Sequence, residues 1–247
     1  MNGILEAVIL LAGSGSRLRA GGRTILKPLV PVLGRPLISY TIDALAGAGI
    51  KTVYAIVGFE SETMIGQVEP LVPAGLDVRF IHNPDWQKQN GISVLSAANY
   101  LTQPFLLTMS DHLFDQTIFD LLMNAATADS LHLAIDRKIS TIFDLQDAMK
   151  IQMKDDLIVT IGKNLSDYNA IDTGLFVCPP ELFAYLNRAK RDGDCSLADG
   201  VQLMADDGKA RGVDIADGWW QDVDTPEMLH QAEQKLAERS KTQMLAR

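Results

Sequence analysis

The chain has 247 residues, of which 47% are apolar, and a formal net charge of −9. The acidic balance, with no basic run, argues against nucleic acid as a partner, because neutralising phosphates along a duplex requires clustered lysine and arginine. The two cysteines, Cys178 and Cys195, lie too far apart for a metal-binding pair, which disfavours structural zinc and indicates thiols of a reducing compartment. Without a signal peptide or an apolar stretch of about eighteen residues, we expect a cytoplasmic protein with no membrane insertion.

The first half of the chain alternates predicted strands with predicted helices. The apolar run at 7–11 predicts a strand buried on both faces, and helical spacing of apolar residues follows Pro36 as far as about residue 48. The other elements expected here are strands at 51–57, 77–81 and 105–109, and helices through 64–68 and at 92–100. Such alternation is typical of a mainly parallel sheet.

The second half changes this rhythm, because two short apolar runs flank a polar turn at 154–156 and predict a β-hairpin. Antiparallel strands are therefore expected to join the sheet. The other elements expected are strands at 131–135, 170–177 and 213–215, helices from Pro179 to about 189 and at 196–205, and a last helix after Pro226 whose end, 240–247, frays. The predicted fold class is α/β, one domain with a mixed, mostly parallel central sheet flanked by helices.

A glycine loop follows the first strand directly. Gly13 and Gly15 allow backbone N–H groups to turn toward a ligand, and Arg17 and Lys27 add positive charge, a combination that suits a polyphosphate. A simple tight turn is the alternative. The chain has no Gly-Lys-Ser/Thr triplet, and Leu18 stands where a dinucleotide fingerprint requires glycine or alanine, so two commoner phosphate loops are excluded. The loop residues expected to bind nucleotide are Leu11, Ala12, Gly13, Ser14 and Gly15.

Asp111, just past the strand at 105–109, is the first candidate ligand for Mg²⁺, which prefers carboxylate and phosphate oxygens. In an open α/β sheet it faces the same crevice as the glycine loop. Its expected partner is Asp224 or Asp222, because two carboxylates two residues apart on an extended segment point to one face and one of them is spare for metal. Asp224 is ranked above Asp222. The alternatives are an Asx turn at Asp111 and a capping box formed by Asp224 and Glu227.

Further candidates lie on loops that reach the same rim. Lys163 follows a glycine at a strand end, where it either is solvated or grips a second phosphate. Asn90, Gly91 and Ser93 lie at the start of a short helix. The side chains of Asn90 and Ser93 either cap this helix or form hydrogen bonds to a base or ribose. The acceptors expected to bind a polyol are Asn169, Asp172, Thr173 and Asp222.

These motifs together resemble one family, the CTP:inositol-1-phosphate cytidylyltransferases. The matching runs are residues 11–18 (LAGSGSRL), 27–30 (KPLV), 109–115 (MSDHLFD), 161–163 (IGK), 168–176 (YNAIDTGLF) and 220–226 (WQDVDTP). The first two are typical of nucleotidyltransferases at large, whereas 109–115 and 168–176 are more particular. Leu11 departs from the alanine that relatives commonly have, which is expected to alter packing beside the base.

The resemblance implies a nucleotide-diphospho-sugar transferase (GT-A-like) fold, with a nucleotide half at 1–125 and an acceptor half at 126–240. It implies transfer of CMP from CTP to inositol 1-phosphate, with Arg17, Lys27 and Lys163 as catalytic cations and Mg²⁺ on Asp111 and Asp224. The lack of hydrophobic spans in this chain implies a separate CDP-alcohol phosphotransferase for the next step.

Three alternatives remain at this point. One is a sister cytidylyl- or uridylyltransferase acting on phosphocholine, an aminoalkyl phosphonate or a sugar 1-phosphate. Another is a GT-A glycosyltransferase, which requires a D-x-D motif that residues 111–113 do not supply. The last is a nucleotide sensor that has lost turnover.

Overall fold

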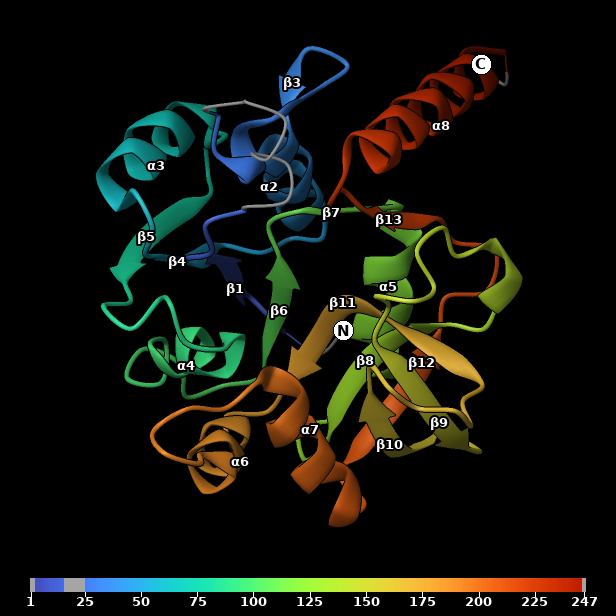
Figure 1. The fold of residues 1–247 in the computed structure, drawn as a ribbon. Helices are drawn as coiled ribbons and strands as arrows, with labels where there is room; N and C mark the ends of the chain where they lie inside the picture. The colour runs from blue at the N-terminus through green and yellow to red at the C-terminus, as the bar shows by residue number, and fades with distance from the viewer. Residues whose placement is uncertain (1–2, 16–24, 246–247) are drawn as a thin grey trace.

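A nine-stranded mixed sheet forms the centre of the computed structural model, which describes residues 3–15 and 25–245 (Figure 1). Its strands, in the order of the sheet, are β5 (Asp77–His82), β4 (Thr52–Val57), β1 (Glu6–Leu11), β6 (Phe105–Met109), β11 (Ala170–Cys178), β8 (Leu131–Asp136), β12 (Ala210–Asp214), β10 (Leu157–Gly162) and β9 (Lys150–Lys154). Two small pairs are separate from it: β2 (Pro31–Val32) with β3 (Arg35–Pro36), and β7 (His112–Phe114) with β13 (Trp220–Asp222).

The sheet joins the two halves of the chain without a break. β5, β4, β1 and β6 are parallel, as their alternation with helices predicts. β11, from the second half, then lies antiparallel between β6 and β8. β12 runs parallel to β8, and the β9–β10 hairpin closes the far edge antiparallel. The predicted mixed α/β sheet is confirmed, with the parallel pairs concentrated in the first half.

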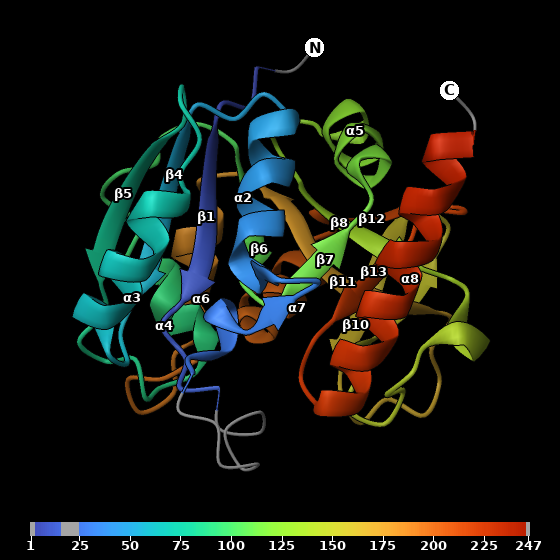
Figure 2. The ribbon, with the colours of Figure 1, turned by 90° about the horizontal axis from the view of Figure 1, so that it is seen from above.

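Helices cover both faces of the sheet and bury two apolar cores (Figure 2). On one face lie α4 (Asn90–Leu95), α6 (Leu182–Ala189) and α7 (Leu197–Asp206); on the other lie α2 (Leu37–Gly47), α3 (Ser61–Val68) and α5 (Gln116–Ala125). β1 contributes Val8 and Leu10 to the first core and Ala7, Ile9 and Leu11 to the second, because successive side chains of a strand alternate between faces.

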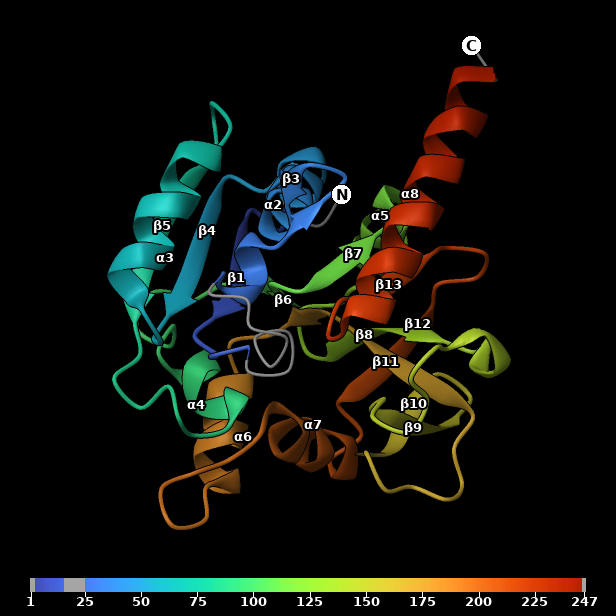
Figure 3. The same ribbon diagram turned by 45° about the horizontal axis from the view of Figure 1, so that its top comes forward.

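The last helix, α8 (Pro226–Leu245), packs through Leu229 and Ala232 against Val32 and Leu113, and its far end points away from the sheet (Figure 3). The helix continues to Leu245, into the 240–247 stretch for which the sequence predicts fraying. In the part of the chain that the structure describes, no helix is both long and apolar enough to cross a membrane.

Most predicted elements are confirmed, with shifted ends. α4 is shorter than expected and begins at Asn90, and α6 begins at Leu182 rather than at the prolines before it. The sequence analysis missed α5, although Ile118, Phe119 and Leu122 of this helix are fully buried at helical spacing. Short 3₁₀ turns complete the chain: η1 (Lys27–Leu29), η2 (Glu69–Leu71) and η3 (Ile139–Thr141).

Candidate active site

Two distant carboxylates, Asp111 and Asp224, are brought together by the small β7–β13 ladder. Asp222 pairs in register with His112, and the Val223 N–H donates to the Asp111 carbonyl at 2.9 Å. Asp111 directly precedes β7 and Asp224 follows β13, so this pairing places both acids at the carboxyl end of β6. Asp111 and Asp224 are 113 residues apart in the sequence but close together in the folded chain.

Lys27 lies between these two acids. Its Nζ forms ion pairs with Asp111 Oδ2 and with Asp224 Oδ1, and the side chains of Lys27 and Asp224 are only 12% and 11% exposed. Burial alone would lower the pKa of Lys27, but the two carboxylates outweigh it and raise that pKa above its ordinary value. Burial would likewise raise the pKa of Asp111, yet Lys27 and His112 hold it well below its usual range. Lys27 is therefore protonated and Asp111 ionised at neutral pH.

The glycine loop packs directly on Lys27. Gly15 has a φ of +60°, and a Cβ there would lie 2.5 Å from the Lys27 Cβ, so a larger residue would push the loop away. Gly13 has open space instead, and both glycines line a cavity of about 350 Å³. The cavity's other lining residues are Leu10, Lys27, Pro28, Asn90, Met109, Ser110, Asp111, His112 and Asp224.

The carboxylate pair suits a magnesium ion better than a zinc ion. Both carboxylates reach one nitrogen, Lys27 Nζ, so they are close enough to share one cation. Among the described residues no group of three or more His, Cys, Asp or Glu side chains is arranged to hold a metal. Mg²⁺ is commonly bound by one or two carboxylates together with substrate phosphates, and the donor set fits that pattern.

The capping alternative for Asp224 is wrong. At the start of α8 it is Thr225 whose Oγ1 accepts the Met228 N–H, at 3.2 Å, so Asp224 is not needed as the cap. A capping box does form at the start of α7, where Ser196 and Asp199 exchange bonds.

His112 links the carboxylate pair to the second half of the chain. Its Nδ1 lies 2.6 Å from Asp111 Oδ1, and its ring stacks on Trp220. Burial lowers the pKa of His112, but Asp111 and then Asp222 raise it above its ordinary value. Gly174 has a φ of +79°, and a Cβ there would lie 2.8 Å from His112 Nε2. The glycine of the 168–176 run therefore lets β11 pass this ring.

Asp172 lines a small cavity, of about 60 Å³, that shares Asn90 and Met109 with the larger one. Its Oδ1 accepts the Gly174 N–H at 2.7 Å. Burial raises the pKa of Asp172 to about 6, against weaker lowering by that bond and by His112. Burial also raises the pKa of Asp222. Asp172 thus lines the small cavity beside the one at Lys27. Asp222 lines a separate hollow of about 490 Å³, although its carboxyl is close enough to His112 and Lys27 to interact with them electrostatically.

Three of the loop residues predicted to bind nucleotide do not line the cavity at Lys27. Leu11 is 1% exposed and faces the second core. Because neighbouring side chains of a strand point to opposite faces, Leu10 lines the cavity instead. Ala12 is buried, and its carbonyl accepts the Phe59 N–H at 3.0 Å. Ser14, between the two glycines, is half-buried and does not line the cavity.

The predicted trio on α4 holds that helix in place rather than projecting freely. Asn90 Oδ1 accepts the Leu197 N–H at 2.8 Å, although the residue also lines the cavity. Ser93 is buried and its Oγ accepts from Asn83 Nδ2 at 3.0 Å. A Cβ on Gly91 would lie 2.6 Å from the Cys195 carbonyl oxygen, so this glycine allows α4 to approach the start of α7.

Two of the predicted polyol-binding residues also make structural contacts. Thr173 is fully buried, and its hydroxyl donates to the Ala134 carbonyl at 2.8 Å. Asn169 bonds both the N–H and the carbonyl of Met153, at 2.8 and 2.9 Å, and so joins the start of β11 to β9. Thr173 is buried, whereas Asn169 is exposed and keeps one amide N–H and one oxygen lone pair beyond these two bonds.

Lys163 lies at the end of β10, half exposed, and its Nζ pairs with Asp147 Oδ1 at 2.5 Å. It does not line the 350 Å³ cavity. A row of register pairs nevertheless connects it to the site: Gly162 with Lys150, Lys150 with Ile171, and Ile171 with Asp136. Lys163 and Asp172 therefore follow the two residues of this row that flank Lys150. Arg17 lies outside the described residues.

Sequence reasoning missed four residues that line the site, Leu10, Pro28, Met109 and Ser110. Ser110 and Met109 end β6 and so lie where a ligand is expected, at the carboxyl end of a strand. That signal was present in the sequence.

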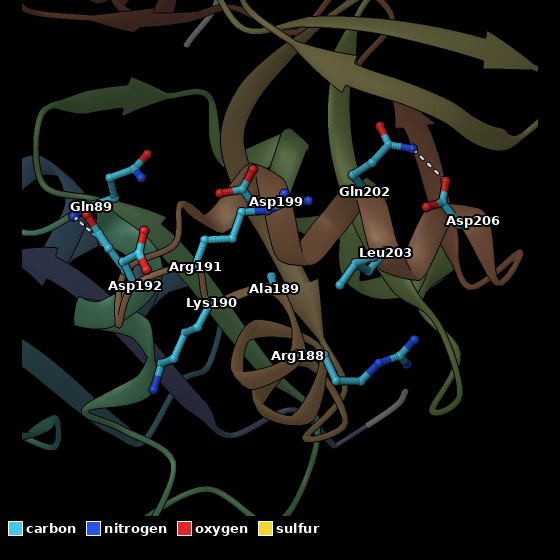
Figure 4. A pocket seen from close by; sticks show the side chains of 11 residues that line it. Gln89, Arg188, Ala189, Lys190, Arg191, Asp192, Asp199, Gln202, Leu203 and Asp206 are labelled. Atoms are coloured by element: carbon cyan, nitrogen blue, oxygen red, sulfur yellow. Dashed lines mark hydrogen bonds between the residues drawn. The ribbon is translucent and has the colours of Figure 1, made fainter.

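A larger hollow of about 900 Å³ lies between α6 and α7 (Figure 4). Arg188, Arg191, Asp199 and Asp206 are among its lining side chains. It shares no lining residue with the cavity at Lys27, and acids and bases are mixed along its wall. Size alone does not make it the reaction site.

Fold and site together define a nucleotidyltransferase: a glycine loop, a lysine and a carboxylate pair meet at the carboxyl end of a mixed α/β sheet. Residues 7–141 match the MobA-like NTP transferase domain family, and the chain belongs to it. Among solved structures, the inositol-1-phosphate CTP transferase from T. maritima superposes with a TM-score of 0.84 at 23% identity, covering 95% of this chain and 97% of that one. A putative glucose-1-phosphate thymidylyltransferase from Bacillus anthracis reaches a TM-score of 0.76 at 16% identity over 92% and 93% of the two chains.

Two curated relatives carry the name bifunctional IPC transferase and DIPP synthase. The protein from Thermococcus kodakarensis is 36% identical over 235 residues, and that from Rubrobacter xylanophilus 32% over 232 residues. These alignments cover 94% and 93% of this chain but only 50% and 51% of the relatives. The chain therefore spans about half the length of the curated relatives it matches.

Proposed function

We propose that this protein transfers CMP from CTP to inositol 1-phosphate, giving CDP-inositol and pyrophosphate. The observation that carries nucleotidyl transfer is the Lys27 ammonium between Asp111 and Asp224, on the wall that the glycine loop completes. The names of the relatives and the sequence runs at 109–115 and 168–176 support inositol 1-phosphate as the acceptor.

The reaction needs an in-line attack and little proton transfer. An oxygen of the inositol phosphate forms a bond to the α-phosphorus of CTP while the bond to pyrophosphate breaks. A phosphate monoester has a second pKa of roughly 6, so the attacking oxygen is already ionised near neutral pH. No general base is required, and catalysis consists of positioning and charge neutralisation.

The chain's own cations supply the neutralisation. Lys27 lies at the cavity wall, where its ammonium stabilises the triphosphate as negative charge shifts onto the leaving pyrophosphate. Arg17 is proposed to bind the same triphosphate and Lys163 the acceptor phosphate. Asp111 and Asp224 would hold Mg²⁺, which neutralises phosphate charge when bound.

The acceptor ring requires hydrogen-bond acceptors for its hydroxyl groups. Asp172 and Asp222 are the proposed partners. Asp172 lines the small cavity next to the one at Lys27, and Asp222 pairs in register with His112, which lines the larger cavity. Asn169 and Thr173, with their internal bonds, are proposed to support this wall rather than to touch the ring. CDP-inositol is an activated alcohol, so its expected consumer is a CDP-alcohol phosphotransferase.

The test is an acceptor panel. The protein is incubated with CTP or UTP, Mg²⁺ and one acceptor from inositol 1-phosphate, phosphocholine, an aminoalkyl phosphonate and glucose 1-phosphate, and pyrophosphate release is followed. We expect release with CTP and inositol 1-phosphate, and CDP-inositol by mass spectrometry. Release with a different acceptor alone would overturn the proposed substrate, and nucleotide binding without product would indicate a sensor.

A further inference from the structure

Lys150 is a buried lysine whose hydrogen bonds in the described structure all go to backbone carbonyls. Its side-chain Nζ donates to the carbonyls of Gln146 and Ala148, each at 3.3 Å, and to that of Lys163 at 2.7 Å. The residue is 8% exposed. Burying an ammonium is costly, so a cation at this position indicates a need that an apolar side chain would not meet.

The three carbonyls belong to two segments that also meet through side chains. Asp147, between the two carbonyls held on one side, forms the 2.5 Å ion pair with Lys163 Nζ. Lys150 thus fixes the backbone at Lys163, while Asp147, on the segment that Lys150 also fixes, orients the Lys163 ammonium. The buried Lys150 Nζ therefore holds the backbone of Lys163 directly and its ammonium indirectly, through the segment that carries Asp147.

Lys150 also lies at the junction of three strands. As the first residue of β9, it pairs in register with Gly162 of β10 and with Ile171 of β11. Lys163 directly follows Gly162, and Asp172 directly follows Ile171. The Asp172 N–H donates to the Met149 carbonyl at 2.9 Å. Lys150 therefore fixes the position of Lys163, the proposed phosphate-binding residue, relative to the cavity that Asp172 lines.

We propose that Lys150 is a positioning residue for the acceptor phosphate, acting through Lys163. This inference rests on the proposed function, in which Lys163 binds that phosphate. It assigns Lys150 no contact with the substrate.

The experiment is a double-mutant cycle with Lys150→Met, Lys163→Met and the double variant, in the full chain. The KM for the acceptor and the KM for CTP are measured separately, with whichever acceptor supports turnover in the panel above. We expect Lys163→Met to raise the acceptor KM by about 10- to 100-fold and Lys150→Met to raise it by about 10-fold, with the KM for CTP changed less than about twofold. The double variant should be no worse than Lys163→Met, because the two residues act in series.

Gln202→Met is the matched control for lost stability in the same hairpin. The Gln202 carboxamide ties β10 to α7 through the Ile161 N–H and the Val159 carbonyl, at 3.0 and 3.1 Å, without bonding Lys163. We expect it to lower Tm while leaving the acceptor KM near that of the wild type. If Lys150→Met does not fold, Lys150→Gln, which keeps one amide donor, takes its place in the cycle.

The outcomes separate the two hypotheses. A wild-type acceptor KM in Lys150→Met, or effects that simply multiply in the double variant, would overturn the positioning role and leave the proposed function intact. An unchanged acceptor KM in Lys163→Met would overturn the phosphate contact and the inference with it. Failure of inositol 1-phosphate in the panel concerns only the substrate, since the cycle uses any acceptor that turns over.

Discussion

Lys27 has the densest electrostatic surroundings of the site residues described here. It forms two ion pairs with little solvent exposure, and Gly15 packs on its stem. In the proposed reaction a bound triphosphate would bring more negative charge to the same wall, so we expect the ammonium to matter both to the folded protein and to turnover.

Replacing Lys27 by methionine keeps the apolar stem and removes the charge. We expect turnover to fall by about 10²-fold or more, which is about 3 kcal/mol of lost transition-state stabilisation. Steady-state pyrophosphate release measures it, and Lys51→Met, an exposed lysine, is the matched control. Near-wild-type turnover in the Lys27 variant would remove this residue from the site.

Asp172 makes stability depend on pH. Its pKa of about 6 in the folded protein lies above the ordinary value of 3.8, so the folded state binds the proton more tightly than the unfolded state does. The free energy of unfolding should therefore fall as pH rises from about 4 to about 6, and it should remain lower above that range.

Asp172→Asn removes this titration while its amide oxygen still accepts the Gly174 N–H. Relative to the wild type, the variant should gain stability at about pH 7.5, by at most about 3 kcal/mol, and gain little at about pH 4.5. Urea unfolding at both pH values measures the difference. Asp120 is an exposed acid on α5, and Asp120→Asn should change the free energy of unfolding by the same amount at both pH values. An equal effect of Asp172→Asn at both would contradict the assignment.

At the scale of elements, the contact between α4 and the start of α7 forms one wall of the site. Gly91 allows it sterically, and Asn90 secures it by bonding Leu197. Of the residues predicted on α4, Asn90 is therefore both structural and adjacent to the cavity.

Gly91→Ala should force these two segments apart. We expect the free energy of unfolding to drop by about 1 to 3 kcal/mol, as in other overpacked contacts, together with a higher KM for the nucleotide. Gly66→Ala, in α3, is the control, because its Cβ would meet nothing within 4 Å. That variant should be stabilised by about 0.5 to 1 kcal/mol, since alanine is the better helix former. Equal effects of the two substitutions would show that the α4–α7 contact is not tight.

At the scale of the whole molecule, β11 joins the proposed nucleotide and acceptor halves. It pairs with β6 of the first half on one side and with β8 of the second on the other. Neither half completes the sheet alone, so we expect the single-domain prediction to hold in solution.

One cooperative unfolding transition should follow from this pairing. In a Trp86→Phe variant the remaining tryptophans, Trp219 and Trp220, report on the second half and on its contact with β7 of the first half. Their fluorescence and the far-UV ellipticity of the whole chain should give the same urea midpoint. Two separated midpoints would show that the halves unfold independently.

The sequence by itself determined the nine strands of the central sheet and most of the helices, and it predicted the chemical type of the site. Apolar runs and their periods are local signals, and so are the glycines at 13 and 15 and the acids that follow strands. Gly13, Lys27, Asp111 and Asp224 were predicted on that basis, and all four line one cavity.

Only the tertiary structure decided which side chains are free to act. The face that Leu11 takes, the internal bonds of Ser93, Asn169 and Thr173, and the burial of Lys150 depend on partners distant in the chain. The Asp111–Asp224 pair depends on the register of β7 with β13, which neither segment encodes alone. Local patterns specify what a residue can do, whereas packing specifies whether its polar atoms remain available.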